Sequence, residues 1–536
     1  MIWKLAHSLT RLKYSAELAV LLVLCQASLQ AAEDLSALAD TDDQDIPVAF
    51  IKIDANNVVR ESLPDAFFGF NIRWSGFQKD LWDKDNDRVK PQIVEALTPF
   101  EGALYRYPGG LVANEYMWEK AVLPIGERKR AAAGLAGGDK PPLFGVREFF
   151  DFVRQVDGNP LYTLNIIGKG KPSDIQEYAS EKMAASNRLL ASYIKELTPH
   201  RKTRYYQLGN ELDRNRYEWS HEKYISRSRA TIEAIQSVDA DARFIAFLRE
   251  FRWRYRGEKK GGISTSEDFI RDVLTGLPMV NDYSLHFYYD GVLRPGGKFK
   301  HIQDVVDRIK GTLAVAASVR GKQPLNVWIT EHSRRLIVTK DNEQMAKTYT
   351  TNLQAALSTA DFLTAMTQIP EVKSTGLQAL NGVGRQIFDA SVRHGDLRPL
   401  SVYWAMRILN QGRQGRVLST TTQSPAGSGY PGGYDVRATG LASEANGLTV
   451  WVVNRALTSM DSDISYLPLK GQTVEMQHYF LAGKHGINAD ALGDDYQLDI
   501  QPAWQEAEFS DSGVLSVRLP PSSVSTIVLR GKGGAK

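Results

Sequence analysis

Cysteine is almost absent from this chain, which has a single one, Cys25, among its 536 residues. It ends an apolar run, residues 18–25, that follows basic residues and precedes small and polar ones. This order is typical of a secretory signal peptide, and we expect residues 1–31 to be removed on export. The mature chain would then have no disulfide, no thiolate nucleophile and no cysteine-ligated metal.

Long apolar runs and an excess of one charge are also missing. The run at residues 18–25 is far shorter than the roughly 20 apolar residues that span a bilayer, so we expect no membrane anchor in the mature chain. Lys and Arg number 65 and Asp and Glu 62, a net charge of +3, which does not favour nucleic acid as a partner. With the signal peptide, these features predict a secreted or periplasmic protein.

Residues 32–46 are rich in acids and contain no base, which predicts a solvated acidic linker between the signal peptide and the folded chain. Beyond it, short β-rich runs alternate with amphipathic helical stretches, for instance at residues 146–155, 175–197 and 221–237. This alternation indicates βα units and a parallel sheet.

Eight candidate strands lie between residues 63 and 410. They are 66–74, 103–108, 160–166, 204–211, 243–249, 282–289, 325–331 and 375–381. Eight strands in an α/β pattern predict a (β/α)8 TIM barrel. An open doubly wound sheet is the less favoured alternative, because no glycine-rich strand-to-helix turn is present.

Short alternating runs replace the helical pattern after residue 410. They are 448–456, 473–483, 514–520 and 525–531. Such runs indicate an antiparallel β-sandwich over residues 411–531. We expect residues 47–62 to contribute a strand to the same domain.

Two glutamates end predicted strands of the barrel. Glu211 ends the fourth strand and Glu331 the seventh. Barrel enzymes carry their chemistry at the C-terminal strand ends, where these two strands face each other across the mouth. Two carboxylates in one site can act as acid and nucleophile if their surroundings separate their pKa values, which is what glycoside cleavage requires.

The motifs around these glutamates resemble those of clan A retaining glycoside hydrolases, most closely the family 51 α-L-arabinofuranosidases; the glucuronidase/heparanase-like and family 39 enzymes are further relatives. The matching segments are Leu208–Glu211 (LGNE), Tyr105–Gly110 (YRYPGG), Tyr116–Glu119 (YMWE), Ser284–Tyr288 (SLHFY), and residues 448–455 and 519–529 of the predicted sandwich. The resemblance spans residues 47–531.

The resemblance implies roles for individual residues. Glu211 would be the general acid/base, and Glu331 the nucleophile that forms a glycosyl-enzyme intermediate. Asn210 would hold the sugar hydroxyl next to the anomeric carbon, and His286 and Tyr288 would orient the nucleophile. Retention of configuration would place the two carboxyl groups about 5 to 5.5 Å apart.

Arginines at predicted strand positions add a further expectation. Arg106 is a charge within an apolar strand, where burial is costly without a partner, so we expect it to bind a strand-end carboxylate such as Glu331. Arg73 stands where the arabinofuranosidases usually have a sugar-binding glutamate, and Leu111 where they have asparagine.

Guanidinium groups suit carboxylate recognition, so Arg73 makes an anionic, uronate-containing polysaccharide a plausible substrate. A cationic cluster after the fifth strand points the same way. It comprises Arg249, Arg252, Arg254, Arg256, Lys259 and Lys260. Trp219 lies just past Glu211 and is a candidate platform on which a sugar ring could stack.

No motif for a metal or cofactor accompanies these residues, since the chain has no His-Glu-x-x-His sequence and no aspartate-rich calcium loop. We therefore predict no metal and no cofactor. The leading hypothesis is a secreted retaining glycosidase on a polysaccharide or oligosaccharide, arabinofuranosidase-like. One alternative is an endo-acting glycosidase on an anionic polysaccharide; another is a carbohydrate-binding protein without turnover.

Overall fold

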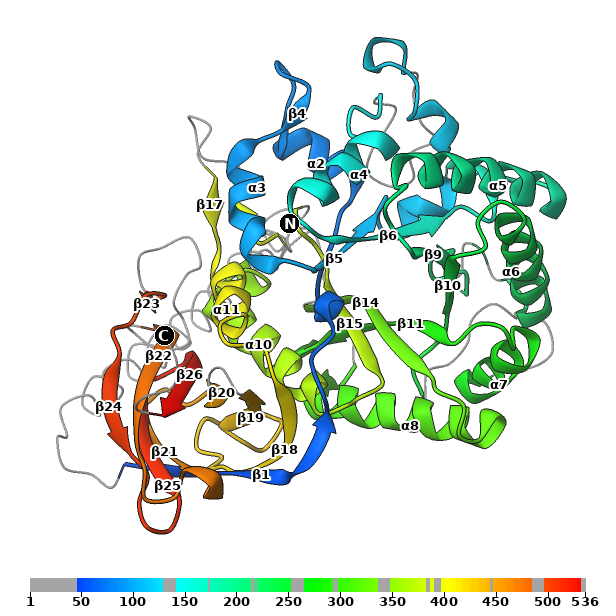
Figure 1. Cartoon of the computed structure of the whole chain (residues 1–536). Helices are drawn as coiled ribbons and strands as arrows, with labels where there is room; N and C mark the ends of the chain where they lie inside the picture. The colour runs from blue at the N-terminus through cyan, green and yellow to red at the C-terminus, as the bar shows by residue number, and fades with distance from the viewer. Residues whose placement is uncertain are drawn as a thin grey trace, which may run out of the picture. The chain divides into compact units, whose positions relative to one another are not determined.

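In the computed structural model (Figure 1), the compact folded unit begins at Val48. The structure describes residues 46–128, 141–171, 174–213, 217, 219–251, 265–292, 297–335, 348–381, 386–389, 397–443, 447–483 and 496–531. The predicted signal peptide and nearly all of the acidic linker lie outside the described residues. Both remain expectations from the sequence.

Eight parallel strands form a closed barrel in the order β10-β11-β14-β15-β2-β5-β6-β9. Their bounds are β2 (Phe68–Asn71), β5 (Leu104–Tyr107), β6 (Asn159–Leu164), β9 (Arg204–Leu208), β10 (Ala242–Phe247), β11 (Asp282–Tyr289), β14 (Asn326–Arg334) and β15 (Val372–Leu377). Each predicted run contains or overlaps one of these strands, so the predicted barrel is confirmed. The strands read as apolar runs because the barrel interior and the outer helices bury both of their faces.

Helices surround the barrel strands (Figure 1). Their bounds are α2 (Trp74–Asp80), α3 (Pro91–Leu97), α4 (Val146–Gln155), α5 (Ser180–Leu197), α6 (His221–Gln236), α7 (Ser266–Gly276), α8 (Ile302–Arg320), α10 (Leu353–Thr367) and α11 (Ser401–Leu409). The helix predicted from residue 175 begins later, because residues 174–177 form strand β8. The start of α6 is set by Ser220, whose hydroxyl accepts a hydrogen bond from the Lys223 N–H at 3.2 Å.

Four two-stranded hairpins occupy loops that follow barrel strands. They pair β3 (Trp82–Asp83) with β4 (Arg88–Val89), β7 (Gly168–Lys171) with β8 (Asp174–Glu177), β12 (Gly291–Val292) with β13 (Phe299–Lys300), and β16 (Phe388–Asp389) with β17 (Arg398–Pro399). They follow β2, β6, β11 and β15 respectively. Loops in these positions lie at the C-terminal face of a barrel, where such enzymes place their chemistry.

The C-terminal part of the chain forms a ten-stranded sheet in the order β23-β22-β26-β20-β19-β18-β1-β21-β25, with β24 paired to β22. The bounds are β1 (Val48–Arg60), β18 (Arg416–Gln423), β19 (Val436–Ser443), β20 (Gly447–Asn454), β21 (Met460–Ser465), β22 (Thr473–Gly483), β23 (Tyr496–Asp499), β24 (Gln505–Glu508), β25 (Val514–Leu519) and β26 (Ser523–Gly531).

Strand β1 precedes the barrel strands in the sequence but joins this sheet. It pairs antiparallel with β18 and parallel with β21, so the domain is mixed rather than purely antiparallel. Alternate residues Ala49, Ile51 and Ile53 are buried, and they share one apolar core with residues of β20, β25 and β26. Burial on one face explains the period-two pattern of the sequence.

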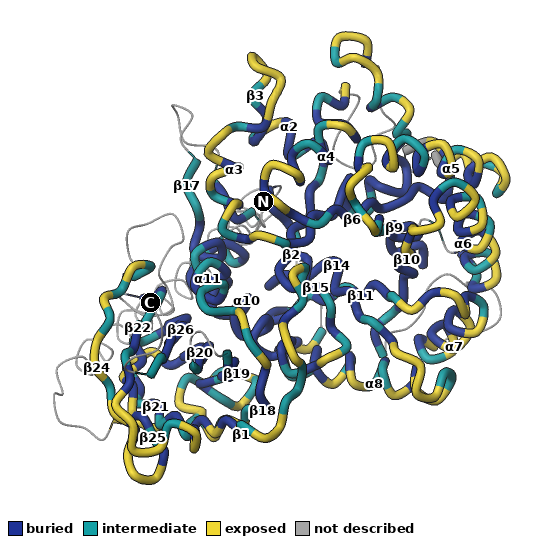
Figure 2. The backbone as a smooth tube through the Cα atoms, in the orientation of Figure 1, coloured by how far each residue is buried: buried dark blue, intermediate teal, exposed yellow. Residues whose placement is uncertain are grey.

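Buried ion pairs join the barrel to the sheet. Asp361 on α10 accepts hydrogen bonds from Arg455 Nε and from Tyr434 Oη, each at 2.7 Å, and also binds Arg437 of β19. Figure 2 shows the barrel strands buried and exposed residues on the outer helices. Within the described ranges, no helix combines the length and apolarity needed to cross a membrane.

Candidate active site

Glu211 lies in the loop after β9 rather than at the end of the strand itself. The strand stops at Leu208, and the chain then turns through Gly209 (φ 71°) and Glu211 (φ 49°). Asn114 holds this turn: its side-chain amide donates to Asn210 O at 2.6 Å, and its Oδ1 accepts from Asn210 N–H at 2.9 Å. The turn brings the Glu211 carboxylate, which is 4% exposed, into the barrel mouth.

Glu331 lies within β14, which continues past it to Arg334. It is also 4% exposed, and polar groups bind both of its carboxylate oxygens. Arg106 Nη1 donates to Oε1 at 3.0 Å, as the sequence predicted, and Tyr288 Oη donates to Oε2 at 2.8 Å. These two contacts hold the carboxylate in one orientation.

Arg106 is completely buried. In addition to the bond from Nη1 to Glu331, each of its three guanidinium nitrogens donates to a neutral side-chain oxygen. Nε donates to Gln207 Oε1 and Nη1 to Asn71 Oδ1, both at 2.7 Å, and Nη2 donates to Asn210 Oδ1 at 2.5 Å. This network compensates the desolvated charge and links strands β2, β5, β9 and β14.

Sequence reasoning missed Asn71 as part of this site. Its amide nitrogen donates to Thr330 O at 2.7 Å while its Oδ1 accepts from Arg106. Asn71 therefore couples the backbone beside Glu331 to the buried guanidinium. A polar residue at the end of the first strand was the available signal.

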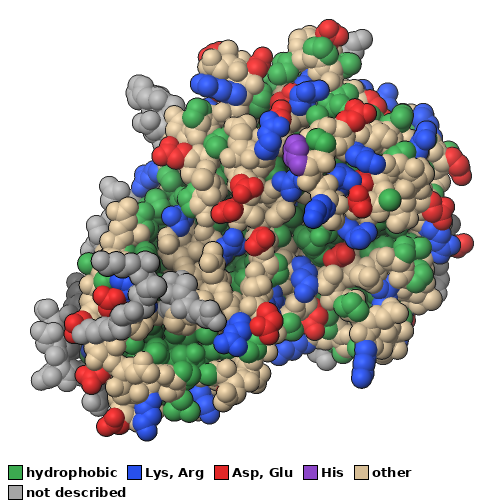
Figure 3. All heavy atoms as spheres, in the orientation of Figure 1, with side chains coloured by type: hydrophobic (Ala, Val, Ile, Leu, Met, Phe, Trp, Pro, Cys, Tyr) green, Lys and Arg blue, Asp and Glu red, His purple; other side chains and the backbone are tan. Residues whose placement is uncertain are grey.

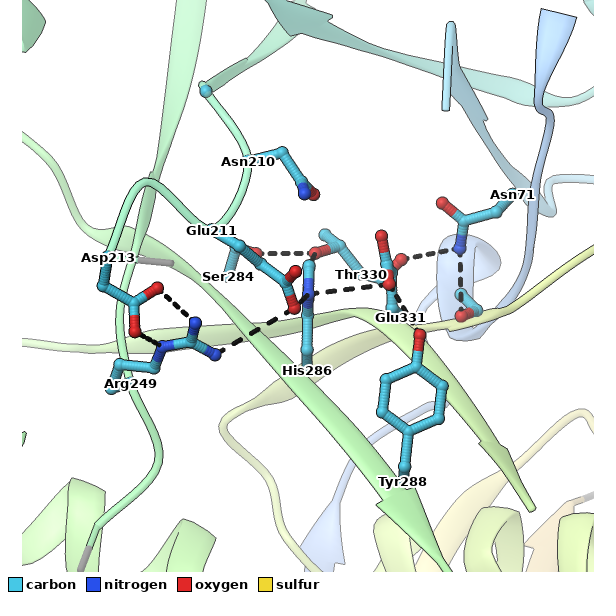
Figure 4. Close-up of polar contacts among 12 residues, drawn as sticks. Asn71, Asn210, Glu211, Asp213, Arg249, Ser284, His286, Tyr288, Thr330 and Glu331 are labelled. Carbon is cyan, nitrogen blue, oxygen red and sulfur yellow. Dashed lines mark hydrogen bonds and ion pairs between the residues drawn. The ribbon is translucent and has the colours of Figure 1, made fainter. Parts of the chain in front are cut away.

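His286 lies between the two glutamates (Figure 4). Its Nδ1 is 2.9 Å from Glu211 Oε1 and 3.7 Å from Glu331 Oε2, and its Nε2 is 3.0 Å from Thr330 Oγ1. The resemblance assigned His286 to orienting the nucleophile. The structure places its Nδ1 closer to Glu211 than to Glu331.

Arg249 and Asp213 flank Glu211 on the side away from Glu331 (Figure 4). Arg249 Nη1 lies 4.0 Å from Glu211 Oε1, and Asp213 binds Nε and Nη2 of the same guanidinium. Arg249 belongs to the cationic cluster that the sequence singled out, and the rest of that cluster lies outside the described residues. Asp213 was missed, although it stands only two positions after Glu211.

The surroundings of Glu331 favour its ionised form. Burial by itself raises the pKa of this carboxyl, but His286 and Arg106, with the Tyr288 hydrogen bond, outweigh both burial and the neighbouring Glu211. The net result is a pKa below the ordinary value for glutamate. The group is thus a carboxylate at neutral pH, which is the state that a nucleophile needs.

One oxygen each from Glu211 and Glu331 and a ring nitrogen of His286 lie within 4.8 Å of one another, which is close enough for three metal ligands. Two guanidinium groups border the same space, Arg106 at Glu331 and Arg249 at Glu211. Their positive charge opposes a cation between the carboxylates. The arrangement therefore suits proton transfer better than metal binding.

The two other predicted substrate-binding residues, Arg73 and Trp219, differ in their surroundings. Arg73 directly precedes α2, and its partly buried side chain has an enclosed Nε that forms no hydrogen bond within the described structure. Trp219 is only 2% exposed, and Lys223 and Arg227 lie over its ring, at 5.0 and 5.2 Å. Its faces are covered, so we do not include it in the proposed sugar site.

Comparison with known proteins supports the family resemblance. No protein-family model matches the chain. It is 24% identical over 214 residues to an intracellular exo-α-(1→5)-L-arabinofuranosidase of Streptomyces lividans, a match covering 38% of this chain and 31% of the relative. The aligned part of the chain thus spans about a third of that relative's length.

Solved structures show the same fold over most of the chain. An α-L-arabinofuranosidase from Thermotoga maritima, determined with arabinose, has a TM-score of 0.69 at 16% identity, covering 90% of this chain and 100% of that one. A family 44 xyloglucanase from Paenibacillus polymyxa has a TM-score of 0.56 at 12% identity, covering 90% and 99%. Both likenesses concern the fold, a TIM barrel with a β-sheet domain.

Proposed function

We propose that this chain is a retaining glycoside hydrolase, with Glu331 as nucleophile and Glu211 as general acid/base. The observation that carries the proposal is the spacing of the two carboxylates, which have oxygens within 4.8 Å of each other. Retaining enzymes separate these groups by about 5 to 5.5 Å, whereas inverting enzymes need about 6.5 to 9.5 Å to admit a water molecule.

In the first step, a Glu331 oxygen attacks the anomeric carbon while Glu211 transfers its proton to the glycosidic oxygen. The bond to the leaving group breaks, and a glycosyl ester forms on Glu331. In the second step, Glu211 removes a proton from water, the water oxygen attacks the anomeric carbon, and the Glu331 carboxylate is released. Each glutamate returns to its starting protonation state.

The neighbours of each glutamate suit these roles. Arg106 and Tyr288 bind Glu331 in the charged form that attacks, and they hold it in one orientation. At Glu211, the described guanidinium is that of Arg249, whose Nη1 is 4.0 Å from Oε1 and whose other two nitrogens bind Asp213. Asn210 remains the proposed hydroxyl-binding residue, since its Nδ2 is buried and has no hydrogen-bond partner in the described structure.

The substrate that we propose is a polysaccharide or oligosaccharide with arabinofuranosyl-like ends. The arabinofuranosidases found by comparison support this choice. We also propose that the protein is exported, on the strength of its N-terminal sequence. The intact pair of glutamates favours turnover over a purely carbohydrate-binding role.

The test is product analysis by mass spectrometry after incubation with arabinan, a neutral β-glucan and several uronate-containing polysaccharides. We expect the parent to release sugar from at least one of them and Glu331→Gln to release none. Glu95→Gln, an exposed glutamate of α3, is the control and should match the parent. Equal product from the parent and Glu331→Gln would contradict the assignment.

The retaining step has its own experiment. With a glycoside that carries a highly activated leaving group, Glu211→Gln should still form the glycosyl ester but hydrolyse it slowly. Intact-protein mass spectrometry should then show an added glycosyl residue, and peptide mapping should locate it on Glu331. An initial product of inverted configuration, observed by NMR, would rule out the double displacement.

A further inference from the structure

Arg73 is a cation at the barrel mouth for which the described structure shows no carboxylate partner. Arg73 stands two residues after β2 ends, at the C-terminal end of the first barrel strand. The backbone on either side is tied to the second strand: Ile72 N–H donates to Arg106 O at 2.8 Å, and Trp74 N–H donates to Pro108 O at 3.1 Å. The Arg73 backbone is therefore fixed beside the strand that supplies the guanidinium bound to the nucleophile.

Two adjacent glycines pack between the Arg73 backbone and the Glu331 carboxylate. A Cβ built on Gly109 would lie 3.3 Å from Arg73 Cα, and a Cβ built on Gly110 would lie 2.6 Å from Glu331 Oε1. Gly109 has φ 132°, a backbone conformation that other residues rarely adopt. The chain therefore passes tightly between Arg73 and Glu331, which places Arg73 at the margin of the sugar site.

Among the described residues, buried Arg334 contacts neutral oxygens, but several other buried arginines have a carboxylate partner. These pairs are Arg106 with Glu331, Arg204 with Asp239, and Arg455 with Asp290. Arg73 differs: within the described structure no carboxylate pairs with it, and its enclosed Nε bonds to nothing. Burial lowers its pKa from the ordinary arginine value, with no acid to oppose the effect. The group nevertheless stays charged at neutral pH.

On the face shown in Figure 3, the overall surface charge would not select anionic substrates. Basic and acidic side chains are intermingled there, rather than gathered into a patch of one sign. A preference for anionic sugar would then depend on individual residues in the site. A partly desolvated guanidinium without an acid partner is the chemical group best suited to that task.

We propose that Arg73 binds a substrate carboxylate, so that the enzyme acts on a polysaccharide carrying a uronic acid at or next to the bond that is cleaved. This inference rests on the proposed glycosidase function and adds to its proposed substrate a uronic acid near the cleaved bond. The carboxylate would accept hydrogen bonds from the terminal nitrogens of the guanidinium, since Nε is enclosed by the protein. The binding energy would add to that of the sugar hydroxyls.

The experiment compares a uronate-containing polysaccharide with its carboxyl-reduced form, which has the same linkages but a primary alcohol in place of each carboxylate. The parent should give a higher kcat/KM on the native polymer. In Arg73→Ala we expect the ratio of native to reduced kcat/KM to fall about 10- to 100-fold, the range for losing a charge-assisted hydrogen bond. Arg73→Lys should keep part of the ratio, since it keeps the charge but not the fork geometry.

Arg88→Ala is the matched control, because Arg88 lies in the same loop region but is exposed and near Asp83 at 3.6 Å. Its ratio should equal that of the parent. An unchanged ratio in Arg73→Ala, or equal cleavage of both polymers by the parent, would overturn the carboxylate site.

Calorimetric titration of Glu331→Gln with uronate oligosaccharides separates this inference from the proposed catalysis. Binding that weakens when Arg73→Ala is added to Glu331→Gln would support the carboxylate site; if the parent released no product from the same polymers, the glycosidase proposal alone would fail. Binding that is indifferent to Arg73 would refute the carboxylate site in either case.

Discussion

Asp213 binds the guanidinium of Arg249 through two nitrogens, while the third nitrogen, Nη1, lies 4.0 Å from Glu211 Oε1. The candidate acid/base thus has a cation nearby that is already paired with another carboxylate. Without Asp213, Arg249 would still have the Glu211 carboxylate beside it. We expect the pairing with Asp213 to hold Arg249 back from a closer contact with Glu211.

Asp213→Asn should therefore slow the proton-dependent step. We expect Arg249 to move onto Glu211 and stabilise its carboxylate form, which cannot protonate a leaving group. General acid catalysis typically contributes about 10²- to 10⁴-fold, so kcat/KM should fall at least about 10-fold for a substrate with a poor leaving group. A substrate with an activated leaving group should be affected much less.

Measuring both substrates gives this prediction its control. Equal losses on the two would indicate general damage to the site rather than an effect on proton donation. Circular dichroism of the variant would confirm that it is folded.

Tyr288→Phe should shift the acid limb of the pH profile to higher pH. The Tyr288 hydrogen bond contributes to lowering the pKa of Glu331, so its loss raises that pKa. A nucleophile with a raised pKa loses its charge sooner as the pH falls. Losing one charge-assisted hydrogen bond should move the acid limb of the kcat/KM profile by about one pH unit.

The matched control is Tyr479→Phe, which removes a hydroxyl on β22 that donates to Gln477 Oε1 at 2.9 Å. Its pH profile should overlay that of the parent. An acid limb in Tyr288→Phe that stays in place or moves to lower pH would show that the hydroxyl does not stabilise the carboxylate.

Gly110→Ala should displace the nucleophile. The new methyl group would lie 2.6 Å from Glu331 Oε1, and that oxygen is held by Arg106 and cannot move away freely. A misplacement of about 1 Å can cost about 100-fold in rate, and we expect a kcat loss of that order.

Gly126→Ala is the comparison, since a Cβ at Gly126 meets nothing within 4 Å. It should leave kcat unchanged. Parent-like turnover in Gly110→Ala would mean that the glycine turn can yield without moving Glu331.

Asp361→Asn should destabilise the junction between barrel and sheet. Asp361 is fully buried and binds Arg455 and Arg437, so its loss leaves two desolvated guanidiniums undercompensated. Removing one partner from a buried ion pair costs about 3 to 5 kcal/mol of unfolding free energy. Denaturant unfolding, with fluorescence of the chain's tryptophans as the signal, measures the change.

Asp461→Asn provides the surface counterpart. Its partner Arg518 is half exposed, so the loss should be about 0 to 1 kcal/mol. A similar, small effect of both substitutions would show that the buried network contributes little to holding the two domains together.

The barrel could be predicted because its signal is local. Each strand is a short apolar run bounded by polar residues, and eight such runs between helical stretches are typical of one fold. The same logic placed Glu211 and Glu331 at the mouth, since polar residues that follow buried strands converge at one edge. The contact of Arg106 with Glu331 followed from the cost of burying an unpaired charge.

Other features depended on distances that no local pattern encodes. Trp219 follows Glu211 closely, yet its ring is covered by Lys223 and Arg227 of the next helix. Strand β8 occupies residues that fit the helical pattern, because it pairs with β7. Parallel pairing of β1 with β21 joins segments about 400 residues apart, for which periodicity gives no register.

By itself, the sequence determined the order of strands and helices and the two glutamates on which the proposed chemistry rests. Both follow from local patterns, namely apolar runs and the polar residues that end them. Only the tertiary structure decided that His286 bridges the glutamates, that Asp213 binds Arg249, and that Arg73 has no partner in the described structure. These features concern side chains on different strands and on the loops that follow them. Their geometry depends on how the closed barrel brings those loops together.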